Sequence, residues 1–130
     1  MNLEDGFVYS WGINDYGQLG HGDTKDRYIP TLIDGLNKIK KIYCGGDYTM
    51  AINGNKINFQ KYWNLKLEND ELYVWGRNYS GQLGLGNFTK RKKPTKNSFF
   101  ENKKITKLIC GRCHCLALIG KIIFIFDSCF

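Results

Sequence analysis

WGINDYGQLGHG, residues Trp11–Gly22, returns 64 residues later in the chain as WGRNYSGQLGLG, residues Trp75–Gly86. Eight of the twelve positions are identical: the Trp-Gly start, the Asn, the Gly-Gln-Leu-Gly core and the final Gly. A second pair of blocks matches at an offset of 66, with Ile42–Gly45 aligned to Leu108–Gly111 and Met50–Ile52 aligned to Leu116–Leu118. Two ordered blocks of matching sequence indicate an internal repeat.

Each copy contains short apolar runs bounded by glycine, asparagine and aspartate, which is typical of strands joined by tight turns. The 15 glycines against two prolines agree with many such turns. The expected strands are Phe7–Trp11, Tyr28–Ile33, Ile39–Cys44 and Tyr48–Ile52 in the first copy, and Leu72–Trp75, Pro94–Ser98, Ile105–Cys110 and Cys115–Leu118 in the second. Four short antiparallel strands per repeat predict an all-β fold of β-propeller blades, forming a partial, open propeller with little or no α-helix.

The sequence divides into a first repeat (6–52), an Asn/Lys-rich insertion (53–70), a second repeat (71–118) and an apolar tail (119–130) that resembles the start of a next strand. The insertion is either a long binding loop or a tolerated surface expansion, and we favour the expansion because long loops cost little entropy per added residue. If the isolated chain is a stable monomer, the aromatic residues Phe59, Tyr62 and Trp63 of the insertion are the first candidates for capping an exposed end face.

The pattern Tyr-x-Trp-Gly-x-Asn-x-x-Gly-Gln-Leu-Gly-x-Gly, followed by Arg, Pro and Cys-Gly, resembles the regulator-of-chromosome-condensation repeat over most of the chain. This resemblance implies about two blades of a seven-bladed propeller. Two blades cannot close a ring, so we expect exposed apolar end faces and self-association. We also expect Trp11 and Trp75 to occupy equivalent buried positions.

Charge is distributed unevenly along the chain. The formal net charge is +7, and residues 65–130 carry the whole excess, with twelve basic and five acidic residues. The densest run, Lys90, Arg91, Lys92 and Lys93, is a candidate surface for an acidic partner, chromatin or another anion, or a nuclear import signal. The competing interpretation is a solvated turn before Pro94. With no secretory signal or membrane-spanning segment in the sequence, we expect a cytoplasmic or nuclear protein.

Five cysteines, an odd number, argue against a disulfide framework. Cys110-Gly-Arg-Cys113-His114 matches the haem attachment pattern, and with Cys115 it also resembles a metal cluster. Because Cys110 aligns with Cys44, we interpret the segment as an ordinary repeat strand and expect no cofactor and no metal. Alternation along such a strand would direct Cys113 and Cys115 to one face and His114 to the other.

The sequence contains none of the phosphate-loop, nucleophile-elbow or metalloprotease motifs, so we predict no catalytic residues and no enzymatic activity. The favoured function is a protein-interaction module or scaffold. The alternative is a guanine-nucleotide exchange factor for a Ran-type small GTPase at chromatin, which is what the family's founding member does. The ultraviolet-B photoreceptor branch of the family is excluded, because Gly46 and Arg112 stand where that branch carries its sensing tryptophans.

Overall fold

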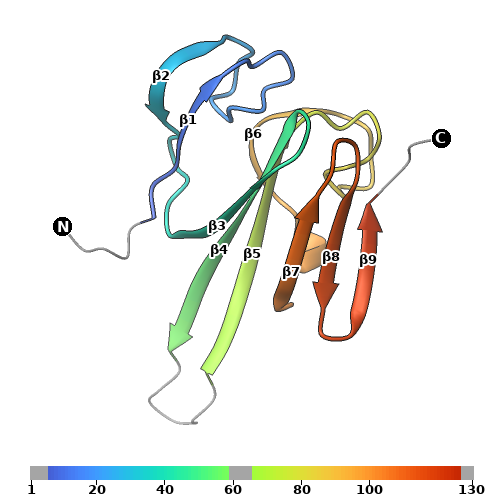
Figure 1. Ribbon diagram of the computed structural model, residues 1–130. Helices are drawn as coiled ribbons and strands as arrows, with labels where there is room; N and C mark the ends of the chain where they lie inside the picture. The colour runs from blue at the N-terminus through green and yellow to red at the C-terminus, as the bar shows by residue number, and fades with distance from the viewer. Residues whose placement is uncertain (1–5, 59–65, 127–130) are drawn as a thin grey trace.

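The computed structural model describes residues 6–58 and 66–126. Its elements are β1 (Tyr9–Gly12), β2 (Arg27–Leu32), β3 (Ile39–Cys44), β4 (Tyr48–Asn58), β5 (Lys66–Gly76), β6 (Arg91–Lys96), the 3₁₀ helix η1 (Ser98–Phe100), β7 (Ile105–Cys110), β8 (Cys115–Ile119) and β9 (Ile122–Phe126). All strand pairs are antiparallel, and the sheets have the orders β1-β2, β3-β4-β5-β6 and β7-β8-β9 (Figure 1). Within the described residues, no helix is long and apolar enough to span a membrane.

The blades do not coincide with the sequence repeats, and the expectation of one four-stranded blade per repeat is wrong. The single four-stranded sheet of the described residues takes β3 and β4 from the first copy and β5 and β6 from the second. Strand β4 of the first copy pairs with strand β5 of the second, with Thr49 opposite Trp75. The chain passes from one sheet to the next within each copy, between β2 and β3 and between β6 and β7. Consecutive antiparallel strands joined by a hairpin pair with each other, so the sheet forms around the hairpin and not around the repeated motif.

The insertion lengthens this hairpin. Strands β4 and β5 stay in register through Asn53↔Glu71 out to Asn58↔Lys66, so the parts of the insertion that the structure describes are strand and not loop. Their buried start also contacts the next sheet, because the carboxylate of Asp70 accepts a hydrogen bond of 3.2 Å from the main-chain N–H of Ile105. Phe59, Tyr62 and Trp63 lie outside the described residues.

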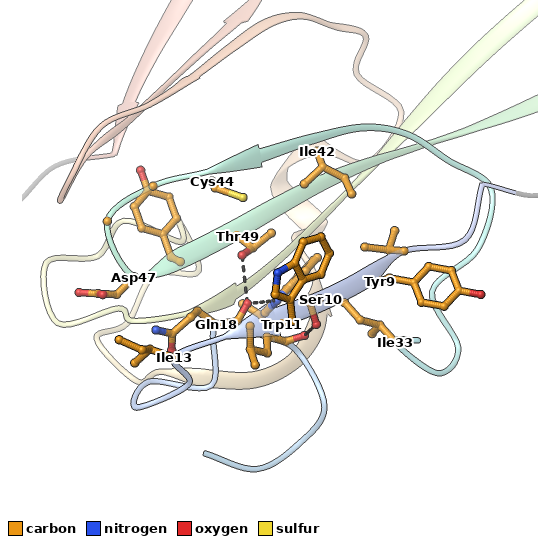
Figure 2. Close-up of a pocket in the computed structure, with 16 residues that line it drawn as sticks. Tyr9, Ser10, Trp11, Ile13, Gln18, Ile33, Ile42, Cys44, Asp47 and Thr49 are labelled. Atoms are coloured by element: carbon orange, nitrogen blue, oxygen red, sulfur yellow. Dashed lines mark hydrogen bonds between the residues drawn. The ribbon is translucent and has the colours of Figure 1, made fainter. Parts of the chain in front are cut away.

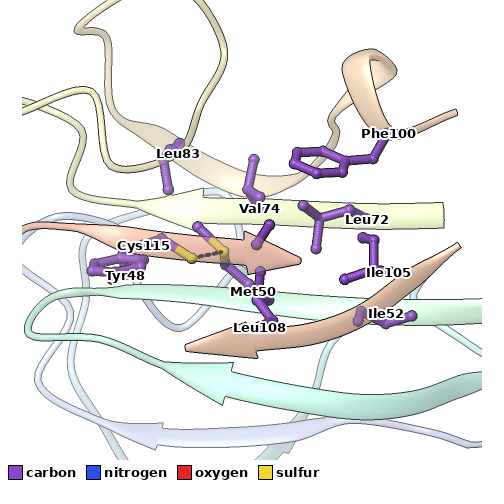
Figure 3. Packing of buried hydrophobic residues seen from close by; sticks show 11 residues of the cluster. Tyr48, Met50, Ile52, Leu72, Val74, Leu83, Phe100, Ile105, Leu108 and Cys115 are labelled. Atoms are coloured by element: carbon purple, nitrogen blue, oxygen red, sulfur yellow. Dashed lines mark hydrogen bonds between the residues drawn. The ribbon is translucent and has the colours of Figure 1, made fainter. Parts of the chain in front are cut away.

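The middle sheet is apolar on both faces, as expected for a blade between two neighbours. Along β4, Tyr48, Met50 and Ile52 point into a cluster shared with β7 and β8 (Figure 3), and Ala51 points to the opposite side. The first cluster consists of Tyr48, Met50, Ile52, Leu72, Val74, Leu83, Phe100, Ile105, Leu108, Cys115 and Ala117. The second consists of Val8, Ile33, Leu36, Ala51 and Trp75, between the β1-β2 pair and the middle sheet. Strand periodicity of two places alternate residues in the two clusters.

Candidate protein-interaction site

The Gly-Gln-Leu-Gly loops are folded around a fully buried asparagine. In the first copy, the Asn14 side-chain oxygen accepts from the N–H of Leu19 at 2.9 Å, and its amide donates to the carbonyls of Asp23 and Lys25. Asn78 of the second copy makes the corresponding bonds to Leu83, Asn87 and Thr89. Such an asparagine satisfies loop donors and acceptors that would otherwise be buried alone. The repeated motif showed the asparagine, but only the bonds show that it organises the loop.

Each loop receives an aromatic side chain from the next blade. The indole Nε1 of Trp75, on β5, donates a hydrogen bond of 2.7 Å to the main-chain carbonyl of Gln18, which also accepts from Thr49 Oγ1 at 3.0 Å. A Cβ atom at Gly20 would lie 2.9 Å from the same indole nitrogen. The glycine is therefore required by the close approach of the ring as well as by its own positive φ of 82°.

The basic run lies on the same interface. Lys90 ends the second loop, and Arg91, Lys92 and Lys93 begin β6. A Cβ at Gly17 would lie 2.7 Å from Cα of Lys92, and one at Gly22 would lie 2.5 Å from Cε of Lys93. The N–H of Gly22 also donates to the carbonyl of Lys92 at 2.8 Å. The backbone and aliphatic stems of the two lysines thus pack on the first loop, as long basic side chains often do.

The second loop is covered by Phe126, the last described residue of β9. Phe126 pairs with Cys115 in the sheet, as Trp75 pairs with Thr49, and Cys115 and Thr49 are matched at the offset of 66. A Cβ at Gly84 would lie 2.8 Å from the Phe126 ring. Phe126 therefore stands at the tryptophan position of the repeat, but its ring has no N–H to donate to the loop.

The expectation that Trp11 and Trp75 occupy equivalent buried positions is wrong. Trp11 is 58% exposed, whereas Trp75 is only 1% exposed. Within the described residues, no preceding Gly-Gln-Leu-Gly loop exists for Trp11 to cover. A cavity of about 390 Å³ opens beside it, between β1 on one side and β3 and β4 on the other (Figure 2). Its walls include Val8, Trp11, Ile42, Cys44 and Thr49.

The exposed apolar side chains that lie with Trp11 on the first two strands and their loop include Ile13, Tyr28 and Ile29. The offset of 64 matches them to Arg77, Lys92 and Lys93. Each matched residue of the second copy contacts the preceding loop, and Arg77 does so by placing its guanidinium 5.1 Å from the ring centre of Tyr16. These exposed side chains of the first copy therefore occupy positions whose counterparts in the second copy contact a preceding loop.

The arginines of the two copies have different partners. Arg27 donates to both carboxylate oxygens of Asp23, at 3.0 and 3.1 Å, and this hydrogen bonding lowers the pKa of Asp23 to about 2. The matched positions of the second copy are Arg91 and Asn87, so the aspartate is replaced by an asparagine, and the Arg91 guanidinium donates to the main-chain carbonyl of Thr89 at 3.2 Å. Arg77 pairs with Asp47 across the hairpin at 3.2 Å.

The cysteine-rich segment is a hairpin. Cys110 ends β7, Cys115 begins β8, and Cys113 lies in the turn, so the expectation that strand alternation places Cys113 beside Cys115 is wrong. Cys115 is fully buried, with its sulfur 3.7 Å from that of Cys110 and 3.5 Å from that of Met50. The contact with Cys110 and burial together raise the pKa of the Cys115 thiol, which disfavours the thiolate that a metal needs. The described residues contain no group of three metal-ligand side chains.

The buried Tyr48 ties this hairpin to the middle sheet. Its hydroxyl lies 2.9 Å from the carbonyl of Gly111 and 2.7 Å from that of His114, where its proton is donated. Burial is the main reason that the pKa of Tyr48 is raised, so the phenol stays protonated as this donor.

The fold and the loop contacts define a stack of propeller blades in which an aromatic side chain of one blade seats on the glycine loop of the one before. The family model of the regulator of chromosome condensation (RCC1) repeat matches residues 5–52 and 69–118. The chain belongs to this repeat family.

Individual proteins of known sequence or structure are also similar to this chain. The chain is 37% identical over 109 residues to human Protein RCC2, covering 82% of this chain and 18% of that protein. It is 35% identical over 113 residues to the Ultraviolet-B receptor UVR8 of Arabidopsis thaliana, covering 85% and 22%. The crystal structure of human WBSCR16 superposes with a TM-score of 0.67 at 21% identity, over 92% of this chain and 29% of that one, which supports the fold. The chain spans about a fifth of the length of these two sequence relatives.

Proposed function

We propose that this chain is a non-enzymatic protein-interaction module, a propeller segment that acts as a scaffold in the cytoplasm or nucleus. The observation that carries the proposal is the exposure of Trp11 beside a cavity, at a position where Trp75 is buried against a neighbouring loop. Buried tryptophans are common energetic centres of protein interfaces, and large exposed apolar patches mark interaction sites. The matching of Ile13, Tyr28 and Ile29 to contact residues extends the same face.

The test compares three forms of the chain, expressed with an affinity tag in cells of its source: wild type, Trp11→Ser and Phe88→Ser. Phe88 is 62% exposed and lies in the loop after Gly86, and it does not line the cavity beside Trp11, so it controls for the loss of an exposed aromatic residue. The proposal expects at least one protein other than the chain itself whose recovery requires Trp11 and not Phe88. Recovery of no such protein would contradict it.

Lys90, Arg91, Lys92 and Lys93 form a second candidate surface, for an acidic protein or for chromatin. Lys92 and Lys93 are exposed residues although parts of them pack on the first loop, and the position matching the carboxylate that pairs with Arg27 is an asparagine for Arg91. Replacing Lys90 and Arg91 with serine spares the two packing lysines. Loss of an acidic partner by this variant, with an unchanged free energy of unfolding, is the expected result.

A further inference from the structure

We propose that two copies of this chain associate head to tail, so that β1 and β2 of one copy complete the sheet begun by β7 and β8 of the other. This inference rests on the proposed interaction function and names its partner. The β1-β2 pair is called the first half-blade. The arrangement is heterologous, since the first half-blade of one copy meets the β7-β8-β9 sheet of the next copy. Within a single chain, strand β9 pairs with the edge of β8 that the proposal assigns to β1 of the second copy. Association therefore requires β1 to displace β9.

The middle sheet shows the completed form of this interface. There β5, which carries Trp75, pairs with β6 on one edge and with β4 on the other, and the register sets Thr49 opposite Trp75. The strand β1 pairs only with β2 in the described residues, so its other edge is free for a partner of the β4 type. Strand β8 is that type, because Cys115–Leu118 aligns with Thr49–Ile52. An exposed strand edge is a template for pairing with another chain.

The side chains agree with this pairing at several positions. In the middle sheet, Trp75, Lys92 and Lys93 cover Gly20, Gly17 and Gly22. Their counterparts in the first half-blade are exposed and strongly apolar: Trp11, Tyr28 and Ile29. The matching glycines of the second loop are Gly84, Gly81 and Gly86, and no atom lies within 4 Å of a Cβ built at Gly86. One chain thus carries both an uncovered set of contact residues and a loop of the kind that they cover.

The cavity beside Trp11 fits the same occupant. It lies between β1 and the faces of β3 and β4 that carry Ile42 and Thr49. In the neighbouring layer, β7 and β8 stack on the opposite face of the middle sheet and bury Leu108, Cys115 and Ala117 there. The β7-β8 hairpin of a second copy, paired to β1, would occupy the cavity in the same way.

Strand β9 is the weaker occupant of the place against β8. Phe126 covers Gly84 but lacks the indole N–H that Trp75 donates to the Gln18 carbonyl. The side chains of Ile122, Ile123 and Ile125 are exposed, and no fourth strand pairs with β9 in the described residues. Trp11 of a second copy would restore the indole donor opposite the Gln82 carbonyl, and β2 would supply the fourth strand.

Sedimentation velocity of the purified full chain over a wide concentration range tests the proposal. Wild type is expected to form a ladder of species growing with concentration, because head-to-tail contacts do not stop at two copies. Trp11→Ser should weaken association about thirtyfold or more, as for a central interface tryptophan. Phe88→Ser should behave as wild type, because its counterpart Thr24 stays exposed although the first loop is covered. Monomeric wild type, or equal losses in both variants, would overturn the proposal.

Removal of residues 120–130 tests the displacement of β9. The shortened chain should associate more tightly than wild type, because β8 no longer has an internal competitor. Adding Trp11→Ser to it should restore a monomer, whereas association independent of Trp11 would contradict the proposed register. A monomeric wild-type chain that still captures another protein through Trp11 would leave the proposed function standing and remove this inference alone.

Discussion

The hydroxyl of Ser10 lies 2.9 Å from Nε2 of His21 and donates its proton to the carbonyl of Leu19 at 2.7 Å. The matched positions of the second copy hold Val74 and Leu85, so a polar pair replaces an apolar one between equivalent strands and loops. Because the hydroxyl proton is engaged, Ser10 accepts from the imidazole and is not placed to lose its proton to it. The pair is structural, and it makes stability depend on pH.

Burial, followed by the charge of Arg27, lowers the pKa of His21 below 6.5, while Asp23 and Asp34 act in the opposite direction. The unfolded chain therefore binds this proton more readily, so stability is highest when His21 is neutral and falls as pH decreases through 6.5. The double variant Ser10→Val/His21→Leu should lose this decline. Urea unfolding between about pH 7.5 and 5.5 measures it, and equal pH slopes for both proteins would contradict the assignment.

Trp75→Phe is expected to destabilise the protein by about 1–2 kcal/mol, because the hydrogen bond to Gln18 is lost while most of the packing remains. The carbonyl keeps its bond from Thr49, which limits the cost. Trp11→Phe is the matched control and should change the free energy of unfolding of the monomer little. Denaturant titration of both variants at low protein concentration makes the comparison.

Gly17→Ala should cost more than Gly35→Ala. Both glycines have positive φ, 79° and 76°, so both substitutions incur about 1–2 kcal/mol of backbone strain. Only at Gly17 would the new Cβ meet a neighbouring backbone, 2.7 Å from Cα of Lys92, whereas no atom lies within 4 Å at Gly35. An additional loss of about 1–3 kcal/mol is expected for Gly17→Ala. Equal losses would show that the loop does not pack on β6.

Catalytic amounts of the chain should leave nucleotide release from a Ran-type GTPase unchanged. This result is expected from the proposed scaffold role, and the described residues form only one four-stranded blade with parts of two others. Release of a fluorescent guanine nucleotide, followed with and without the chain, is the measurement. Acceleration by substoichiometric chain would establish the exchange-factor alternative in place of a scaffold.

Metal analysis of purified, tag-free protein should find no stoichiometric zinc and no haem. Cys110 and Cys115 form one hairpin pair, and the Cys115 thiol lies in the apolar cluster with a raised pKa. Cys110→Ser should accordingly leave metal content unchanged. One tightly held zinc per chain that disappears in this variant would reverse the assignment.

The sequence by itself determined the repeated units, the all-β class and the approximate place of most strands. Turn residues and alternating apolar positions are local signals, and β3 and β7 coincide with the strands expected from them. The two loops were also recognisable from Gly17 and Gly81, since a close turn with positive φ restricts the residue type.

Only the tertiary structure decided that β3 and β4 of the first copy share a blade with β5 and β6 of the second. It also decided which of the two matched tryptophans is buried. Trp11 and Trp75 have the same local sequence, yet one is exposed and the other buried, because burial depends on the loop that a neighbouring blade supplies. Likewise the pairing of Asn53 with Glu71 turned an expected loop into strand, since ladder hydrogen bonds join residues that no local pattern relates. A repeat specifies equivalent contacts, and the fold determines which of them are made.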